Sequence, residues 1–303
     1  MSAAAIVLSR GAARARVLPD AGGRVTALAL AGPDGQALEV LHPYPEDHRD
    51  PVRWAKGGIY PLAPFSNRIA RARVRVDGVD HPVRPHPDAA PHALHGHSHL
   101  QPWQLMARSD DEATLALDAH AGDAWPWAFR AELHYRLEPQ ALHARITLTN
   151  RDRTRMPAGI GLHPYFRHAP SAPVGARWTT LWDQDADGLA VAARPARSDE
   201  NHQLPRALPA GGLTWYASGW DGHASAQLTA GCWLHIAAEP VFGHLVVHRP
   251  DNGAYLCLEP VSHVTDGFNL AARGVSGTGT VWLAPGESLA GAMRFTLSAE
   301  PAC

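Results

Sequence analysis

Hydrophobic and polar residues alternate over short stretches of this chain, which is the pattern of half-buried β-strands. Residues 129–137 and 142–148 alternate on either side of a turn at Glu138-Pro139-Gln140, so they predict a hairpin. A second hairpin is predicted at 73–80, where Asp77-Gly78 supplies a typical tight turn. The same pattern predicts further strands at 3–9, 13–18, 24–30, 36–41, 113–119, 224–230, 232–238, 244–249, 254–259, 279–283 and 291–298.

No stretch of 10–15 residues with helical periodicity separates these strands, which argues against a fold of alternating strands and helices. The 27 Gly and 26 Pro are scattered along the chain and indicate frequent turns. We therefore predict an all-β protein, a single large antiparallel β-sandwich spanning residues 1–303. The segments with the weakest strand pattern are expected to be long loops that carry functional residues; they are 42–68, 81–103, 150–178 and 183–222.

Composition narrows the classes of function. With 45% hydrophobic and 18% charged residues, the chain can bury a core. A net charge of −2 argues against a nucleic-acid or membrane-surface partner, because both need a basic excess. No apolar run approaches a membrane span and no secretion signal is evident, so we expect a cytoplasmic monomer or homodimer. Three cysteines are too few for a disulfide framework in a chain of this length.

A histidine-rich segment lies at residues 92–99. His95, His97 and His99 would share one face of a strand and could then ligate zinc. The flanking prolines favour a polar loop instead, and no cysteine or HExxH-type partner is nearby. We therefore predict no metal and no other cofactor.

Two residues at predicted element boundaries are candidates for proton transfer. His163 follows an apolar stretch and precedes Pro164-Tyr165-Phe166, so it could face a pocket or simply cap a strand. Glu259 shares a strand face with Tyr255 and Cys257, and Pro260 is expected to end that strand. A carboxylate on an apolar face is costly unless it is paired or used, although many strand-end glutamates are merely solvated.

Asn67 and Arg68 lie in the segment Pro64-Phe65-Ser66-Asn67-Arg68-Ile69. The amide offers a donor and an acceptor and the guanidinium offers several donors, a combination suited to sugar hydroxyls. An arginine bound to a surface carboxylate is the alternative.

These motifs occur together and in order, and in this they resemble the aldose 1-epimerase (galactose mutarotase) family. The matching segments are Pro64–Ile69, Leu94-His95-Gly96, His163-Pro164-Tyr165-Phe166, Gly219-Trp220-Asp221-Gly222 and Leu258-Glu259-Pro260. The resemblance extends over about residues 20–298. It implies a galactose mutarotase-like β-supersandwich and interconversion of the α and β anomers of a free aldohexose.

The resemblance also implies roles for particular residues. Glu259 and His163 would be the catalytic pair, and Asn67, Arg68 and His95 would bind the sugar. Many relatives carry Asp or Asn where this chain has Thr214, which bears on the pattern of hydroxyls preferred. Ring opening needs one proton donor and one proton acceptor on opposite sides of the ring, and neither a metal nor a redox cofactor.

Two alternatives share the same fold. A hexose-6-phosphate mutarotase would need basic residues at the pocket rim, for which Arg71, Arg73 and Arg75 are candidates, although an exposed basic hairpin explains them equally well. A non-catalytic carbohydrate-binding domain would not require both His163 and Glu259.

Overall fold

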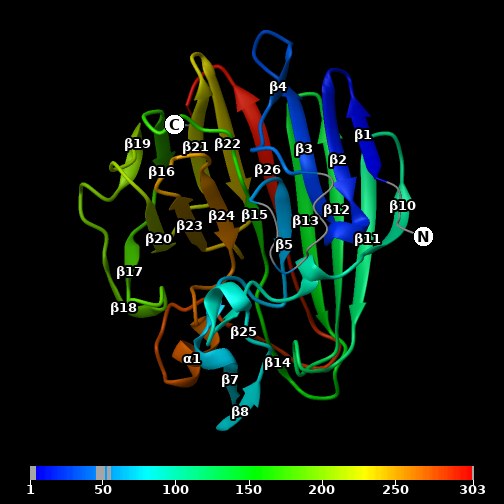
Figure 1. Ribbon diagram of the computed structural model, residues 1–303, viewed down its shortest axis with the longest axis vertical. Coiled ribbons are helices and arrows are strands. Elements are labelled where there is room, and N and C mark those ends of the chain that lie inside the picture. Colours follow the sequence, from blue (N-terminus) through cyan, green and yellow to red (C-terminus); the bar gives the residue numbers. More distant parts are fainter. Residues whose placement is uncertain (1–4, 46–51, 53–55, 302–303) are drawn as a thin grey trace.

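Two large antiparallel β-sheets pack against each other in the computed structural model, which describes residues 5–45, 52 and 56–301 (Figure 1). The first sheet has 11 strands in the order β1-β2-β3-β5-β15-β24-β23-β20-β17-β18, with β4 paired to β3. These strands are β1 (Ile6–Arg10), β2 (Ala13–Leu18), β3 (Arg24–Ala31), β4 (Ala37–Glu39), β5 (Ile59–Leu62), β15 (Gly161–Pro164), β17 (Thr180–Gln184), β18 (Ala190–Pro195), β20 (Leu213–Ser218), β23 (His244–Arg249) and β24 (Cys257–Val261).

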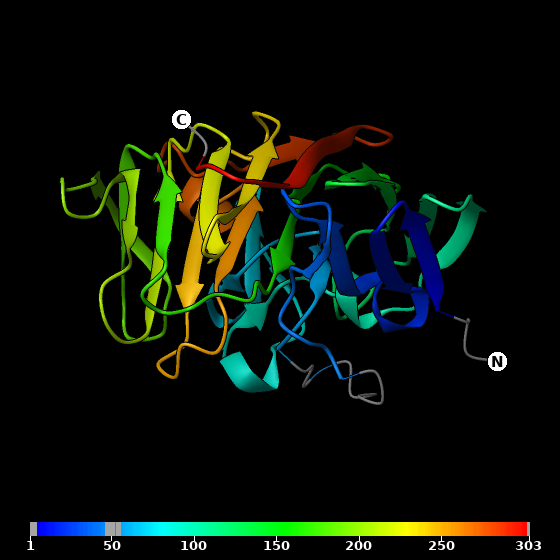
Figure 2. The same ribbon diagram turned by 90° about the horizontal axis from the view of Figure 1, so that it is seen from above.

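The second sheet has nine strands in the order β10-β11-β12-β13-β26-β22-β21-β16-β19. These strands are β10 (Gln104–Arg108), β11 (Glu112–Ala119), β12 (Phe129–Glu138), β13 (Ala141–Asn150), β16 (Pro173–Ala176), β19 (His202–Ala207), β21 (His223–Thr229), β22 (Cys232–Ala238) and β26 (Ser288–Ser298). Figure 2 shows the blue N-terminal strands at one end of the elongated molecule and the green strands of residues 173–207 at the other.

Three two-stranded sheets and a short helix complete the described chain. They are β6 (Arg68–Ile69) with β9 (Ala93–Leu94), β7 (Arg73–Val76) with β8 (Val79–Pro82), β14 (Met156–Ala158) with β25 (Val281–Leu283), and α1 (Gly267–Ala272). Short 3₁₀ turns lie at Pro19–Ala21, Ala70–Ala72, Pro87–Ala89 and Ser98–Leu100. Among the residues that the structure describes, no helix is long and apolar enough to cross a membrane.

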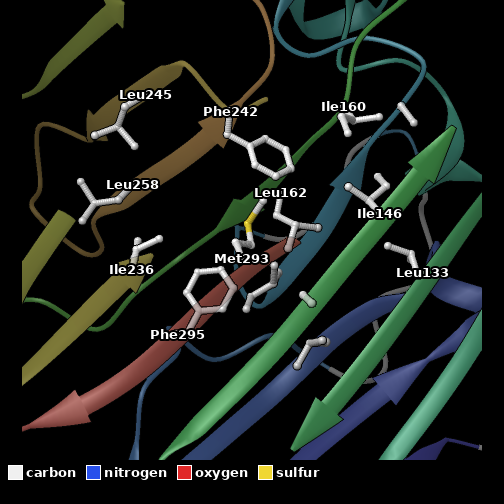
Figure 3. Close-up of a cluster of buried hydrophobic side chains, with 14 of the residues drawn as sticks. Leu133, Ile146, Ile160, Leu162, Ile236, Phe242, Leu245, Leu258, Met293 and Phe295 are labelled. Atoms are coloured by element: carbon white, nitrogen blue, oxygen red, sulfur yellow. The ribbon is translucent and has the colours of Figure 1, made fainter. Parts of the chain in front are cut away.

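The hydrophobic core lies between the two large sheets. Leu133 and Ile146 of the second sheet belong to the same buried cluster as Leu162 and Leu258 of the first (Figure 3). On β12 buried and partly exposed residues alternate, because its other face meets solvent. The predicted all-β antiparallel sandwich is therefore confirmed, and so are both hairpins, β7–β8 and β12–β13.

The central strands of the first sheet behave differently, because every residue of β5, β15 and β24 is buried. Their inner face joins the sandwich core. Their outer face forms a second buried cluster that includes Tyr60, Tyr165, Cys257 and Val261. A covered outer face in the middle of the sheet creates the setting for a pocket.

Several sequence predictions were wrong in this region. The segments expected to be long loops contain strands β5, β9, β14–β16 and β18–β20. Pro260 does not end its strand, since β24 continues to Val261. Glu259 therefore lies inside a buried strand and not at a solvated end. The start of the strand predicted at 3–9, together with Cys303, lies outside the described residues.

Candidate active site

The candidate site is built from two rows of side chains that cross the outer face of the first sheet. The first row follows from the strand register. His163 on β15 lies opposite Tyr60 on β5, and Glu259 on β24 lies opposite Val246 on β23. Val246 in turn lies opposite Tyr216 on β20. On β15 and β24, Gly161 lies opposite Val261, which places His163 opposite Glu259. Two residues far apart in sequence thus become direct cross-strand neighbours.

The second row lies two residues further along each strand. On β23, His248 lies opposite Cys257 and also opposite Thr214. Phe166 forms an antiparallel bridge with Leu256, which keeps the register of β15 and β24. Tyr165 therefore lies opposite Cys257. Since side chains alternate across a strand, both rows point to the same face.

An open pocket of about 390 Å³ lies over these rows. This volume lies in the range of small-molecule sites, about 300–1,000 Å³. All five residues that the sequence predicted for the site line this pocket; they are Asn67, Arg68, His95, His163 and Glu259. The structure therefore brings the predicted residues together from β5–β6, β9, β15 and β24.

His163 and Glu259 are in direct contact on the pocket floor. The His163 Nε2 atom lies 3.3 Å from Glu259 Oε1, and the side chains are 8% and 4% exposed. From the sequence we expected acid and base on opposite sides of a sugar ring. The structure instead places them side by side, because neighbouring strands hold them in register.

Two tyrosines fix the plane of the His163 imidazole. Its ring stacks on Tyr60 at 4.7 Å between centroids and on Tyr165 at 4.6 Å, with interplanar angles of 23° and 17°. Such a sandwich restricts rotation of the imidazole. The sequence analysis placed His163 near aromatic residues but missed the contribution of Tyr60.

Burial acts in opposite directions on the two partners. It raises the pKa of the Glu259 carboxyl well above its usual value and lowers the pKa of the His163 imidazole well below its usual value, in the latter case with help from the charge of His95. Both effects disfavour net charge on the pair. The favoured state of the pair is therefore the one with a single proton between the carboxyl and the imidazole.

Asn67 and His95 hold each other in place at the side of the pocket. The Asn67 N–H donates to His95 Nδ1 at 3.0 Å, and the His95 N–H donates to the Asn67 carbonyl at 2.8 Å. Because Nδ1 accepts a hydrogen bond, the neutral imidazole carries its proton on Nε2. Burial lowers the pKa of His95 well below its usual value, so it is a neutral donor.

Arg68 extends along the pocket beneath a turn at Gly188. A Cβ on Gly188 would lie 3.2 Å from Arg68 Nη1, and the Tyr216 hydroxyl donates to the Gly188 carbonyl at 3.0 Å. The Arg68 carbonyl accepts from the Asp266 N–H at 2.8 Å. The bond from Asp266 holds the backbone of Arg68, while its guanidinium lines the pocket.

Thr214 lines the same pocket from β20. Its hydroxyl lies 2.9 Å from His248 Nδ1, its cross-strand neighbour. The position where many relatives carry Asp or Asn is therefore occupied by a Thr–His couple. His248 was not predicted from the sequence, because nothing in the local sequence links it to Thr214.

The three histidines at 95, 97 and 99 do not form a metal site. His95 faces the pocket, whereas His97 packs on Phe129 of the second sheet at 5.3 Å between ring centroids. The segment is a loop with a 3₁₀ turn at Ser98–Leu100, so the alternating geometry of a strand is lost. This agrees with the loop interpretation and removes the zinc alternative at these residues.

The basic residues divide between the pocket and the surface. Arg71, Arg73 and Arg75 are exposed and none of them lines the pocket. Arg75 instead forms an ion pair with Asp80 across the β7–β8 hairpin at 2.9 Å. Lys56, the only lysine of the chain, does line the pocket, and the sequence analysis gave it no role.

The fold and this geometry define a class of protein: an antiparallel β-supersandwich with a pocket over a buried His–Glu pair on the outer face of its larger sheet. Residues 4–296 match the aldose 1-epimerase family, and the chain belongs to that family.

Individual proteins are similar to this chain in sequence or in fold. The uncharacterized protein YphB of Escherichia coli K12 is 27% identical over 255 residues, which are 78% of this chain and 82% of YphB. The crystal structure of a putative aldose 1-epimerase from E. coli K12 superposes with a TM-score of 0.85 at 24% identity, covering 98% of this chain and 99% of that one. A galactose mutarotase-like protein from Clostridium acetobutylicum superposes with a TM-score of 0.83 at 18% identity, covering 98% and 95%. These likenesses support the fold.

Proposed function

We propose that this protein is an aldose 1-epimerase that interconverts the α and β anomers of a free aldohexose. The observation that carries the proposal is the buried His163–Glu259 contact of 3.3 Å on the floor of the pocket. Asn67, Arg68 and His95 line the same pocket with an amide, a guanidinium and a neutral imidazole N–H, groups that suit sugar hydroxyls.

The chemistry follows from the two oxygens bonded to C1. Opening the hemiacetal removes a proton from the C1 hydroxyl and adds one to the ring oxygen. Glu259 and His163 together hold one proton, so one partner donates it to the ring oxygen while the other takes the hydroxyl proton. Side-by-side placement suits this exchange, because both oxygens are attached to the same carbon.

Reclosure on the other face returns the proton. The open-chain aldehyde turns about its C1–C2 bond. The hydroxyl that formed from the ring oxygen then attacks the opposite face of C1. The two residues exchange roles in this step, so the pair regains its starting protonation state. Arg68, Asn67 and His95 would hold the remaining hydroxyls and keep the open chain in place.

The alternative functions receive less support. For a hexose-6-phosphate mutarotase, Arg71, Arg73 and Arg75 were the candidates to bind the phosphate at the pocket rim. These three residues do not line the pocket. A purely sugar-binding protein would have no use for a buried acid–base pair, whose burial costs free energy.

Polarimetry tests the proposal. Freshly dissolved α-glucose, α-galactose and a hexose 6-phosphate are followed to equilibrium in a weakly catalytic buffer, with and without protein. We expect the protein to accelerate the approach to equilibrium for at least one free aldose. Acceleration confined to the phosphorylated sugar, or none with any sugar, would reject the proposal.

A further inference from the structure

A third potential ligand lies beside the His163–Glu259 pair, buried next to the pocket. Cys257 lies two residues before Glu259 on β24, so both side chains point to the same face. Among the described residues, His163, Cys257 and Glu259 form the one group of three potential metal ligands, with one ligand atom from each within 4.8 Å of the others. All three side chains are buried, and Cys257 is a free thiol.

We propose that this group binds a divalent zinc-like cation and that the bound metal inhibits the enzyme by occupying its acid–base pair. A thiolate, an imidazole and a carboxylate are the ligand types that Zn²⁺ and Co²⁺ prefer in tetrahedral sites. The pocket leaves the fourth position for water.

Geometry supports a compact site. Bond lengths of about 2.0–2.3 Å place tetrahedral ligand atoms roughly 3.3–3.8 Å apart. The 3.3 Å contact between His163 and Glu259 already has this separation. One ligand atom of each of the three residues lies within 4.8 Å of the others. Rotation about the Cα–Cβ bond of Cys257 changes the position of its Sγ atom.

Charge balance also favours a divalent cation. An isolated carboxylate or thiolate is expensive to bury, and Cys257 and Glu259 are 0% and 3% exposed. One Zn²⁺ bound by both anions and a neutral imidazole carries no net charge. Binding would therefore displace the thiol proton and the proton of the His–Glu pair into solvent.

Inhibition follows from the use of the same lone pairs. A metal bound to His163 Nε2 and to the Glu259 carboxylate prevents both groups from accepting or donating a proton. Sugar and metal would compete for the floor of the pocket. The inhibition rests on the proposed function, whereas metal binding by the three residues does not.

Cobalt titration of the metal-free protein tests binding directly. We expect a thiolate-to-cobalt charge-transfer band in the near ultraviolet, which Zn²⁺ removes by displacement. Cys257→Ser should lose this band. Cys232→Ser is the matched control, since Cys232 is a buried free cysteine on β22 in the sandwich core, and it should keep the band. Absence of the band in the parent protein, or its persistence in Cys257→Ser, would overturn the proposal.

Polarimetry with added Zn²⁺ supplies the second readout. Measured against its own metal-free rate, Cys257→Ser should require at least about tenfold more Zn²⁺ than the parent protein for half-inhibition. Equal sensitivity of both proteins, or activation by Zn²⁺, would contradict the inhibitory site. If Cys257→Ser does not fold, Zn²⁺ should still raise the thermal midpoint of the parent, and an excess of sugar should reduce that shift. If the protein mutarotates no sugar, the cobalt band still decides the metal site, so the two failures are distinguishable.

Discussion

At the scale of single residues, the imidazole of His163 is oriented by stacking against two tyrosine rings and not by a hydrogen bond to its Nδ1 atom. Its Nδ1 atom is buried and has no hydrogen-bond partner among the described residues. Stacking between Tyr60 and Tyr165 takes over the orienting role. Nε2 faces Glu259 and is therefore the ring nitrogen placed to exchange a proton with it.

Removing either member of the pair should remove most of the activity. We expect Glu259→Gln and His163→Asn each to lower kcat by at least about 10²-fold, because each removes one proton-transfer partner. The double variant should lose far less than the product of the two effects, since the residues act as one unit. Polarimetric kcat and KM measure this, with thermal unfolding as the control for folding. A folded Glu259→Gln protein within a few-fold of the parent rate would rule out the assignment.

The pair also predicts the pH dependence. Activity requires one proton on the pair, so it should fall where a second proton binds and where the last one leaves. Burial lowers the pKa of His163, which moves the acid limb to lower pH, and raises the pKa of Glu259, which moves the alkaline limb to higher pH. A plot of kcat/KM against pH should therefore be a broad bell with a plateau around neutrality. A single limb crossing neutral pH would contradict a shared proton.

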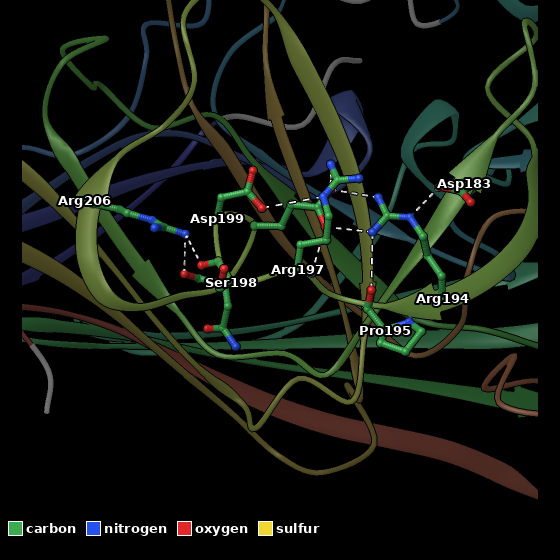
Figure 4. Close-up of polar contacts among 9 residues, drawn as sticks. Asp183, Arg194, Pro195, Arg197, Ser198, Asp199 and Arg206 are labelled. Carbon is green, nitrogen blue, oxygen red and sulfur yellow. Dashed lines mark hydrogen bonds and ion pairs between the residues drawn. The ribbon is translucent and has the colours of Figure 1, made fainter.

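At the scale of elements, one ion-pair cluster fastens the outer strands β17 and β18. Arg194 on β18 lies beside Asp183 on β17, and Arg197 follows in the next turn (Figure 4). Glu200 accepts from Arg194 at 2.7 and 2.8 Å and lies 2.6 Å from Arg197. These contacts lower the pKa of Glu200 to about 2. The cluster connects the segment after β18 to the rim of the first sheet.

Glu200→Gln should therefore destabilise the fold without changing the chemistry. We expect a loss of about 1–2 kcal/mol at neutral pH, because water screens the partly exposed arginines. A carboxyl whose folded-state pKa is lowered stabilises the protein above its unfolded pKa, near 4.5, and loses this effect as the pH falls towards 2. Denaturant unfolding at pH 7 and at pH 3 measures the difference, which should shrink at the lower pH. A constant difference would show that the charge of Glu200 is not its cause.

Asp199→Asn is the matched control. Asp199 contacts Arg197 at 3.6 Å, and both side chains are largely exposed. Its replacement should leave stability unchanged within about 0.5 kcal/mol.

At the scale of the whole molecule, the sandwich supplies a rigid floor and the loops supply the walls. The pair lies on strands whose inner face belongs to the main core, including Leu162 and Leu258. Core strands are the least mobile part of a fold, so they hold the distance between the proton donor and acceptor. Asn67, His95 and Gly188 come from connections above that floor.

Whole-molecule chemistry also predicts independence from metals. The proposed mechanism moves both protons with side chains alone, so prolonged chelation followed by desalting should leave the mutarotation rate unchanged. Polarimetry before and after treatment measures it. A rate that collapses and returns with Zn²⁺ would refute both this mechanism and the inhibitory role proposed for the metal.

Much of the fold was predictable because strand alternation is a local signal. The hairpin of β12 and β13 follows from period-two alternation around Pro139-Gln140, and the strands have one solvated face. The strands missed by the sequence analysis break this condition in two ways. Strand β5 is buried on both faces, and β18 is exposed over most of its length, so neither alternates.

The sequence by itself determined that His163, Glu259, Asn67, Arg68 and His95 belong to a site, through motifs that resemble a family. It also determined the all-β class, because short alternating segments bury one face each. Only the tertiary structure decided that His163 touches Glu259, that Thr214 is bonded to His248, and that Cys257 lies beside the pair. The physical reason is strand order: which strands become neighbours depends on packing of the whole sheet, and cross-strand contacts between distant segments leave no local pattern in the chain.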